Sequence, residues 1–289
     1  MSQFELVCPV QCRLGESPVW VSEREELLFV DVTGQRLYRF VPKSGSLDSL
    51  PVGEDIGFVA PVRGGGYLAG LRSGIWLLDE QACKRRCLAR NPGDERTVRF
   101  NDGGIDPRGR LIIGTIDETR RDGRAGLYRL DPHGLSAIAT GLMTSNGVAF
   151  APDGCTLYHS DTPRFVIYQR DYRPQTGEVG PQREFARLDP NAPDRGRPDG
   201  AAVDTAGCYW SALYEGARVN QYDSSGRLLA ERAVPVRSPT MPAFGGVDLK
   251  TLFLTSAQAT DGTGGGLYAL RVETPGLARI PFDEESLLP

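Results

Sequence analysis

The sequence predicts an all-β protein, a six-bladed β-propeller with four strands in each blade. Turn-forming residues are dense, with 35 glycines and 21 prolines among 289 residues, and no stretch keeps an apolar period of 3.6 residues for long. Short runs of β-branched and aromatic residues lie between the turns, as in strands. Six such runs recur along the chain: "LLFVDV" from residue 27, "YLAGL" from 67, "LIIGT" from 111, "LYHSD" from 157, "YWSAL" from 209 and "LFLTS" from 252.

The spacing of these runs identifies the repeating unit. Their starts are 40, 44, 46, 52 and 43 residues apart, which is the length of a propeller blade. Each run has a strand-like neighbour before it and another after it, whereas a β-sandwich needs no recurring unit of this length. Six units fill residues 1–289 as a single domain. The segment "QFELVC" at residues 3–8 is left over, and we expect it to complete the last blade and close the ring.

Composition excludes several classes of partner. The net charge of −4 offers no attraction for nucleic acid or an anionic membrane, and no apolar run approaches the ~18 residues of a membrane span. The N-terminus lacks the pattern of a signal peptide. Six scattered cysteines then fit a reducing, cytoplasmic compartment. The two CxxxC pairs, Cys8/Cys12 and Cys83/Cys87, are expected to be free thiols, with a zinc site or disulfides as the alternatives.

Oxygen-bearing side chains recur at the start of the innermost strand of four units. They are Glu16 in "GESPVW", Asn101 in "RFNDGG", Asn146 in "SNGVAF" and Asp199 in "PDGAAVD". Taken singly, asparagine and aspartate fit turns, but Glu16 is no turn former. Inner strands of a propeller converge on its axis, so the recurrence at one register favours a shared site.

A divalent cation would explain this grouping. Carboxylates and carboxamides gathered around one axis would repel one another or stay unsatisfied unless a ligand lies between them. Oxygen donors suit Ca²⁺, Mg²⁺ or Mn²⁺. Arg99 and Asn101 share one face of their strand and can both point to the axis. Asp102 faces the other way and is expected to be a structural turn residue.

The motifs "LGESPVW", "RFNDGGIDPRGRLIIGT", "SNGVAF", "RPDGAAVD" and "FGGVDLKTLFLTSA" resemble, in order and spacing, those of the regucalcin and gluconolactonase family of sugar-lactone hydrolases, to which senescence marker protein belongs. The resemblance runs over nearly the full length. It implies that Glu16, Asn146 and Asp199 hold one divalent metal ion and that Asp199 is also the general base. It further implies that Arg99 and Asn101 contact the sugar hydroxyls.

The resemblance implies hydrolysis of an aldonolactone, such as gluconolactone or a pentonolactone, to the aldonic acid. Calcium is the first choice of metal, and Zn²⁺, Mg²⁺, Mn²⁺ and Fe²⁺ are also compatible. The family's acidic substrate contact matches Glu118 best, with Asp117 beside it as the alternative. The particular lactone and the oligomeric state stay open.

Two other functions remain compatible with these residues. One is a propeller without catalytic activity that binds calcium or a protein partner, since fold alone does not decide function. The other is an esterase or phosphotriesterase acting on a non-sugar substrate. A Ser-His-Asp triad is not expected, because His133 fits an exposed turn and His159 fits strand packing. Asp31 and Asp161, which end second strands, are expected in turn or ladder roles, with support of the site as the alternative.

Overall fold

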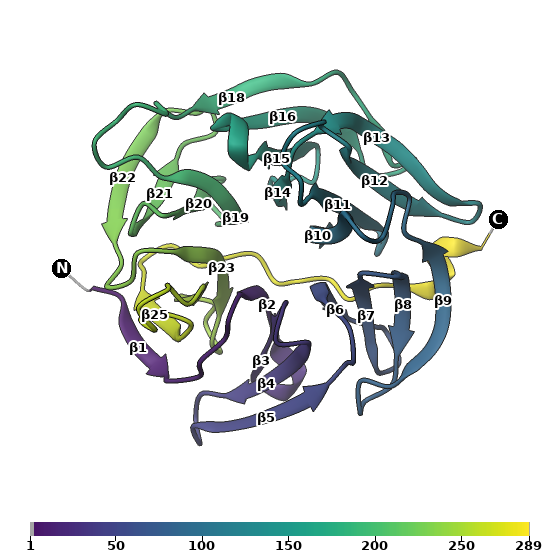
Figure 1. The fold of residues 1–289 in the computed structure, drawn as a ribbon, viewed down its shortest axis with the longest axis horizontal. Coiled ribbons are helices and arrows are strands. Elements are labelled where there is room, and N and C mark those ends of the chain that lie inside the picture. Colours follow the sequence, from purple (N-terminus) through teal and green to yellow (C-terminus); the bar gives the residue numbers. More distant parts are fainter. Residues whose placement is uncertain (1–2, 289) are drawn as a thin grey trace.

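The computed structural model describes residues 3–288 and confirms the predicted propeller, with six antiparallel sheets arranged in a ring about one axis (Figure 1). Each sheet begins with a strand next to the axis and continues outward in chain order, except that the outermost strand of the sixth sheet is the N-terminal one. The first three blades contain β2 (Gly15–Val21), β3 (Glu26–Asp31), β4 (Arg36–Val41) and β5 (Ser46–Pro51); β6 (Ile56–Pro61), β7 (Tyr67–Leu71), β8 (Gly74–Leu78) and β9 (Lys84–Arg90); and β10 (Val98–Ile105), β11 (Leu111–Asp117), β12 (Ala125–Asp131) and β13 (Gly134–Leu142).

The fourth blade departs slightly from the four-strand pattern. Two strands share its outer edge, because different parts of β16 pair with β17 and with β18. The last three blades contain β14 (Ser145–Phe150), β15 (Thr156–Asp161), β16 (Val166–Arg173), β17 (Glu178–Val179) and β18 (Arg183–Arg187); β19 (Arg197–Val203), β20 (Tyr209–Tyr214), β21 (Arg218–Tyr222) and β22 (Leu228–Ala233); and β23 (Pro239–Gly245), β24 (Thr251–Ser256), β25 (Leu267–Arg271) and β1 (Glu5–Cys8).

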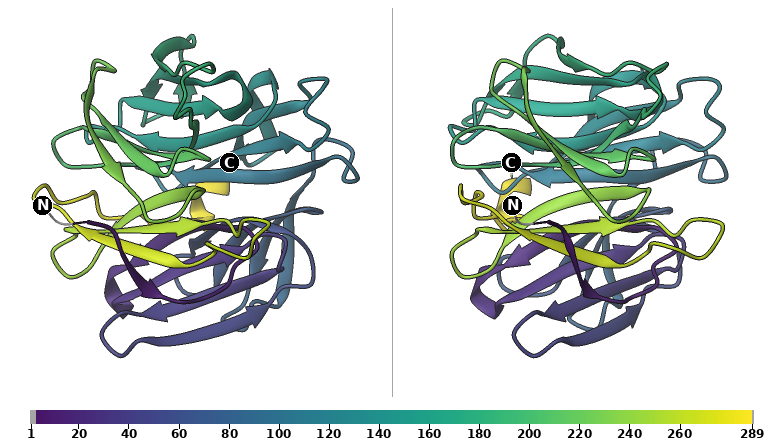
Figure 2. Two further views of the ribbon diagram at one scale, coloured as in Figure 1. Left: turned by 60° about the vertical axis from the view of Figure 1, so that its left-hand side comes forward. Right: turned by 90° about the vertical axis from the view of Figure 1, so that its left-hand side faces the viewer.

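The N-terminal strand closes the ring, as the sequence predicts for residues 3–8. β1 pairs antiparallel with β25, with Leu6 opposite Tyr268, and the side views in Figure 2 show it lying along the last blade. The outermost strand of the sixth blade therefore comes from the opposite end of the chain. This pairing covers an edge that would otherwise expose unpaired backbone groups.

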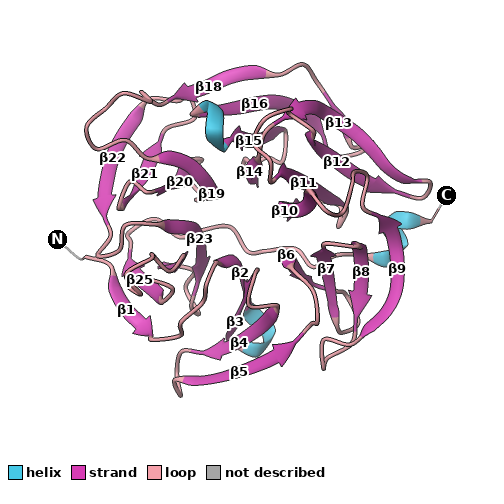
Figure 3. Cartoon of the chain, in the orientation of Figure 1, coloured by secondary structure: helices cyan, strands magenta, loops and turns pink. Residues whose placement is uncertain are grey.

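In the described part of the chain, helical structure is confined to three short 3₁₀ turns, η1 (Ser22–Arg24), η2 (Thr162–Arg164) and η3 (Glu284–Leu287), drawn in cyan in Figure 3. Within residues 3–288, no helix has the length and apolar character needed to cross a membrane.

The hydrophobic core lies between neighbouring blades. One cluster packs Leu28 and Val30 of the first blade against Tyr67 and Leu71 of the second, and all four are fully buried. Two tryptophans pack between blades. Trp20 stacks on Phe253 of the sixth blade, and Trp210 meets Phe244 edge to face. Packing between blades rather than within a blade holds the inner strands at fixed positions around the axis.

The C-terminal segment crosses one end of the axis. It runs through the middle of the ring in Figure 1, from the sixth blade toward the second and third. Backbone bridges connect Gly276 to Asp204 and Phe282 to Val62. The opposite end of the axis lacks this cover.

Candidate functional site

Every inner strand has an irregularity at the same place. Its pairing register with the second strand shifts beside Glu16, Gly57, Asn101, Asn146, Asp199 and Thr240. Such bulges bend a strand and redirect its side chains. In four blades the shift lies at a predicted site residue. The second and sixth blades have Gly57 and Thr240 there, which agrees with their lack of a carboxylate or carboxamide in the sequence.

Close approach of the backbone makes this arrangement possible in the fourth blade. Gly147 follows Asn146 with a φ of +60°, in the left-handed region. A Cβ atom there would lie 2.2 Å from the hydroxyl of Tyr209 and 3.1 Å from the backbone oxygen of Asp199. Only glycine therefore fits between Asn146 and the fifth blade.

The predicted residues meet in one cavity at the uncovered end of the axis. Glu16, Arg99, Asn101, Asn146 and Asp199 all line it, and none is more than 7% exposed. The remaining lining residues are Leu14, Ile116, Arg120, Thr144, Thr162, Pro163, Arg197 and Tyr214. The structure thus brings together side chains that lie as much as 183 residues apart in sequence, between Glu16 and Asp199.

A hydrogen-bond chain connects three blades across this cavity. Nη1 of Arg99 donates to Oδ1 of Asn101 (2.9 Å), and Nδ2 of Asn101 donates to Oδ1 of Asn146 (2.9 Å). Nδ2 of Asn146 in turn donates to Oδ1 of Asp199 and to Oγ1 of Thr162 (3.0 Å). The orientation of each side chain therefore depends on the next one in the chain.

Two buried carboxylates dominate the electrostatics. Burial raises the pKa of Glu16 well above its usual range, and the charges of Asp199 and Asp102 raise it further, against the opposing effect of Arg99. Burial and the charge of Asp102 likewise raise the pKa of Asp199, against the opposing effects of Arg197 and Arg99. Holding both groups ionised is costly unless a cation balances them.

The donor set fits one oxygen-binding cation. Within residues 3–288 no three His, Cys, Asp or Glu side chains gather at one point, so the set is the two carboxylates of Glu16 and Asp199 together with the carboxamide of Asn146. The carboxamide oxygen of Asn146 faces Asn101 and its nitrogen faces Asp199. For this oxygen to coordinate a cation, the amide of Asn146 must rotate. Its nitrogen then no longer donates to Asp199, and Asn146 and Asp199 both bind the cation instead.

The two acidic residues at the end of β11, Asp117 and Glu118, have different roles. Asp117 is fully buried, and its carboxylate accepts hydrogen bonds from Oγ1 (2.6 Å) and the backbone nitrogen (3.0 Å) of Thr119 within its own loop. Glu118 faces Arg99 at 3.3 Å and forms two hydrogen bonds to Arg72. Glu118 is therefore the member that touches the site, through Arg99, and direct contact with substrate stays a prediction.

Two other aspartates position the inner strands. The carboxylate of Asp31 accepts from the backbone nitrogens of Arg13 (2.9 Å) and Leu14 (3.0 Å), just before Glu16. Asp161 accepts from the nitrogen of Thr144 (3.1 Å), just before Asn146. Both have the expected ladder role, and both also fix the strand that carries a site residue.

Eight lining residues were not predicted as site residues by the sequence analysis, among them Arg120, Thr162, Arg197 and Tyr214. Arg197 could have been found, because it precedes Asp199 by two residues as Arg99 precedes Asn101, which places each pair on one strand face. The guanidinium of Arg197 pairs with Glu215 (2.5 Å) and lies 5.3 Å from the ring centre of Tyr214. Arg120 and Thr162 carry no such signal, since Arg120 lies on a loop and Thr162 in the 3₁₀ turn η2, both between strands.

The expectation that Asp102 is a turn residue is wrong. It lies in the bulge of β10, is 3% exposed, and accepts hydrogen bonds from the backbone nitrogens of Gly103 (2.7 Å) and Val148 (2.8 Å). It does face away from the site cavity, as predicted. Burial raises its pKa to about 7, against the opposing effects of these hydrogen bonds and of Arg279.

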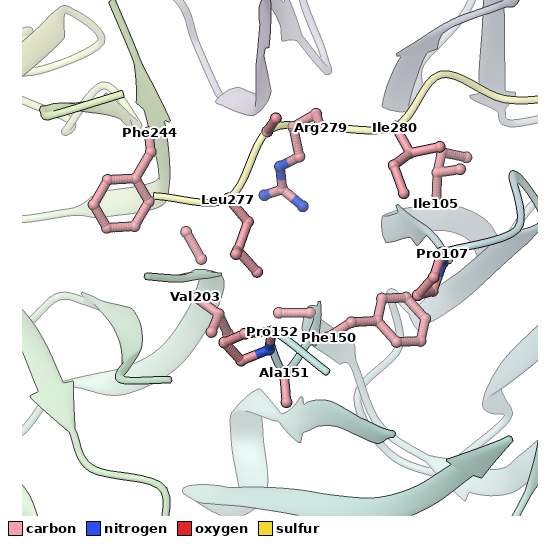
Figure 4. A pocket seen from close by; sticks show the side chains of 13 residues that line it. Ile105, Pro107, Phe150, Ala151, Pro152, Val203, Phe244, Leu277, Arg279 and Ile280 are labelled. Atoms are coloured by element: carbon pink, nitrogen blue, oxygen red, sulfur yellow. The ribbon is translucent and has the colours of Figure 1, made fainter. Parts of the chain in front are cut away.

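A second cavity lies at the opposite end of the axis, under the C-terminal segment (Figure 4). It is the larger of the two, about 210 Å³ against about 100 Å³. Its walls are mostly apolar, with Phe150, Phe244 and Leu277 around the guanidinium of Arg279. A polyhydroxylated ligand needs many hydrogen-bond partners, so the smaller polar cavity is the better candidate.

The histidines and cysteines behave as expected. His159 is fully buried in the fourth blade, where burial lowers its pKa to about 3 and the charge of Arg170 adds to this. His133 is exposed in a turn. All six cysteines are free thiols, including both CxxxC pairs. None of these groups lines the site cavity.

Known proteins resemble this chain over nearly its whole length. Residues 14–258 match the family model described as SMP-30/Gluconolactonase/LRE-like region. A 6-deoxy-6-sulfogluconolactonase from Pseudomonas putida is 41% identical over 282 residues, covering 93% of this chain and 94% of the relative. A pentonolactonase from Haloferax volcanii is 34% identical over 292 residues, covering 96% and 97%. The structure of a calcium-binding regucalcin from Agrobacterium tumefaciens has the same fold, with a TM-score of 0.90 at 24% identity over 96% of both chains.

Proposed function

Because the chain belongs to the SMP-30/gluconolactonase/LRE-like family, we propose that it hydrolyses a sugar lactone to the aldonic acid in the cavity lined by Glu16, Asn146 and Asp199. The observation that carries this proposal is the convergence of two buried carboxylates with Arg99 and Asn101 in one polar cavity. Relatives named as lactonases of sugar derivatives support the reaction class.

In this proposal the cation is held by Glu16, Asn146 and Asp199. A bound divalent ion, with Ca²⁺ as the first choice, would balance the two carboxylates and polarise the lactone carbonyl. Oxygen-only donors favour Ca²⁺, Mg²⁺ or Mn²⁺ over softer metals. The carboxylate of Glu16 accepts a hydrogen bond from the backbone of Ser17 but none from another side chain in the part of the chain that the structure describes, which leaves oxygen lone pairs for a cation.

Asp199 is the general base in this proposal. A carboxylate within reach of the attacking water takes its proton as the new carbon–oxygen bond forms. Thr162 holds the strand at this point, because its hydroxyl donates to the backbone oxygen of Pro198 (2.8 Å). The ester bond of the ring then breaks, and Asp199 returns the proton to the leaving ring oxygen. The product carries a hydroxyl and a carboxylic acid, which ionises to the carboxylate.

Arg99 and Asn101 orient the sugar. Nη1 of Arg99 is engaged with Phe100 and Asn101, whereas Nη2 has no hydrogen-bond partner within residues 3–288. It is thus available to a sugar hydroxyl. Glu118 forms an ion pair with Nε of Arg99 (3.3 Å), which holds the guanidinium in place. The two lactonase relatives are named for sugars that differ in length and in a sulfonate group, so specificity is expected to reside at the mouth of the cavity.

A substrate screen tests this function. Purified protein with added Ca²⁺ is offered gluconolactone, xylonolactone and arabinonolactone, alongside a phosphotriester and an aryl ester, and acid release is followed against enzyme-free controls. We expect hydrolysis of at least one aldonolactone and none of the other two classes. Turnover of the phosphotriester or aryl ester alone would favour the non-sugar esterase, and no turnover would favour the binding propeller.

The free thiols support a reducing, cytoplasmic location.

A further inference from the structure

Arg120 lines the site cavity with a guanidinium that has no partner. It lies in the loop between β11 and β12, at the mouth of the cavity, and its side chain is exposed. Within residues 3–288, this side chain makes no hydrogen bond or ion pair. The charge of Arg120 reaches Tyr214 on the fifth blade, where it works against the burial that raises the pKa of that phenol. The positive charge therefore faces across the cavity.

The backbone holds Arg120 in this position at a cost. Its φ is +53°, in the left-handed region that costs a non-glycine residue about 1–2 kcal/mol. The buried carboxylate of Asp117 fixes the loop by accepting from the backbone nitrogens of Thr119 (3.0 Å) and Arg124 (3.3 Å). A glycine would relieve the strain, so the presence of arginine points to a use for its side chain.

The other cations of the cavity are already paired. Arg99 lies 3.3 Å from Glu118, and Arg197 lies 2.5 Å from Glu215. Neither arginine therefore leaves an unbalanced charge for a ligand, although both retain free hydrogen-bond donors.

Arg120 remains uncompensated once the metal site is filled. A divalent cation would balance the carboxylates of Glu16 and Asp199, which leaves one positive charge at the mouth. An anionic group on the substrate would complete this balance. An arginine is suited to it, because the planar guanidinium binds carboxylates, phosphates and sulfonates through paired hydrogen bonds.

We infer that the substrate is a sugar lactone with an oxyanion on the carbon remote from the lactone carbonyl, and that Arg120 is the residue that selects it. This inference rests on the proposed function, because the carbonyl must lie near Asp199 for the remote end to reach the mouth.

Paired substrates test the inference. The catalytic efficiency kcat/KM is measured for glucono-1,5-lactone and for its 6-phosphate, with glucaro-1,4-lactone as a carboxylate probe and glucono-1,4-lactone as its neutral counterpart. The measured quantity is the ratio of anionic to neutral kcat/KM, at low and at high salt. The variants are Arg120→Gln, Arg120→Lys and Arg120→Gly, with Arg121→Gln as the matched control, since Arg121 is exposed in the same loop and does not line the cavity.

We expect wild type to prefer the anionic member of at least one pair, and Arg120→Gln to lower that ratio at least tenfold, about 1.4 kcal/mol. Arg120→Lys should keep part of it, Arg121→Gln should keep all of it, and high salt should reduce it. Arg120→Gly should lower the ratio while raising the melting temperature. A ratio that stays within twofold in Arg120→Gln overturns the inference yet leaves lactone hydrolysis standing, whereas failure to hydrolyse any lactone removes the proposed function itself.

Discussion

Nδ2 of Asn101 donates to Oδ1 of Asn146 at 2.9 Å, across the boundary between the third and fourth blades. The bond joins a residue expected to contact the sugar to one expected to hold the metal. Asn101 is in turn held by Arg99, and Asn146 holds Asp199. Binding of the cation and binding of the sugar should therefore be coupled, because each uses one of two carboxamides that are hydrogen-bonded to each other.

Replacing Glu16 with glutamine should weaken metal binding. The substitution keeps the shape of a 7%-exposed side chain and removes one of two negative charges, so we expect the Kd for Ca²⁺ to rise at least about tenfold. Calorimetric titration of chelator-treated protein measures this. Glu23→Gln, in the exposed turn η1, is the matched control. Equal affinities for the two variants would remove Glu16 from the metal site.

Arg99→Ala should impair sugar binding and spare the metal. Loss of a charged hydrogen-bond donor costs about 1.5–3 kcal/mol, so kcat/KM for the best lactone should fall roughly tenfold to a hundredfold. Metal affinity should not fall, because Arg99 repels a cation bound at Glu16. Arg96→Ala, exposed in the preceding loop, is the control. A collapse of metal affinity with unchanged KM would mean that the two roles are reversed.

Asp199→Asn should abolish catalysis in a folded protein. The amide retains an oxygen for the metal but cannot accept the proton, and loss of a general base costs ~10²–10⁴ in rate. The measurement is kcat at saturating metal, with a thermal melt alongside. Near wild-type kcat would contradict the assignment of Asp199 as base, and a large fall in melting temperature would indicate a structural role instead.

Stability should fall as pH rises because of Asp102. Its pKa is about 7 in the folded protein, raised by burial from a reference value of 3.8. The folded state therefore binds the proton of Asp102 more tightly than the unfolded state does. The contribution of this proton to the free energy of unfolding is fully present below pH 4 and is lost as pH rises to 7. The loss is on the order of 4 kcal/mol.

Urea unfolding of metal-free protein at several pH values between 4 and 8 measures this effect. In Asp102→Asn the dependence of the unfolding free energy on pH should become weaker, although Glu16 and Asp199, whose pKa values are also raised, still contribute to it. The unfolding free energy at low pH should fall by about 1 kcal/mol, because one of the two hydrogen bonds to Gly103 and Val148 is lost. An unchanged slope in the variant would assign the pH dependence to other groups.

The propeller was predictable because its blades repeat the same polar and apolar pattern, and the inner-strand residues followed from that alignment. Glu16, Asn146 and Asp199 could be predicted from their equivalent positions at the start of the inner strands alone. The bulges were not predictable, since a register shift depends on contacts between strands, and this is why Asp102 was misplaced. Arg120 was equally out of reach, because its position depends on a loop shaped by Asp117. Arg197 was within reach through its spacing from Asp199.

The dependence of lactone hydrolysis on bound metal tests the central claim most directly. Protein freed of metal by a chelator is titrated with Ca²⁺, and the rate of hydrolysis of the best lactone is recorded against the number of ions bound per chain. The proposed site predicts no activity above background without metal and a rise that ends at one ion per chain. Full activity in metal-free protein, or a rise unrelated to the binding of one ion, would contradict it.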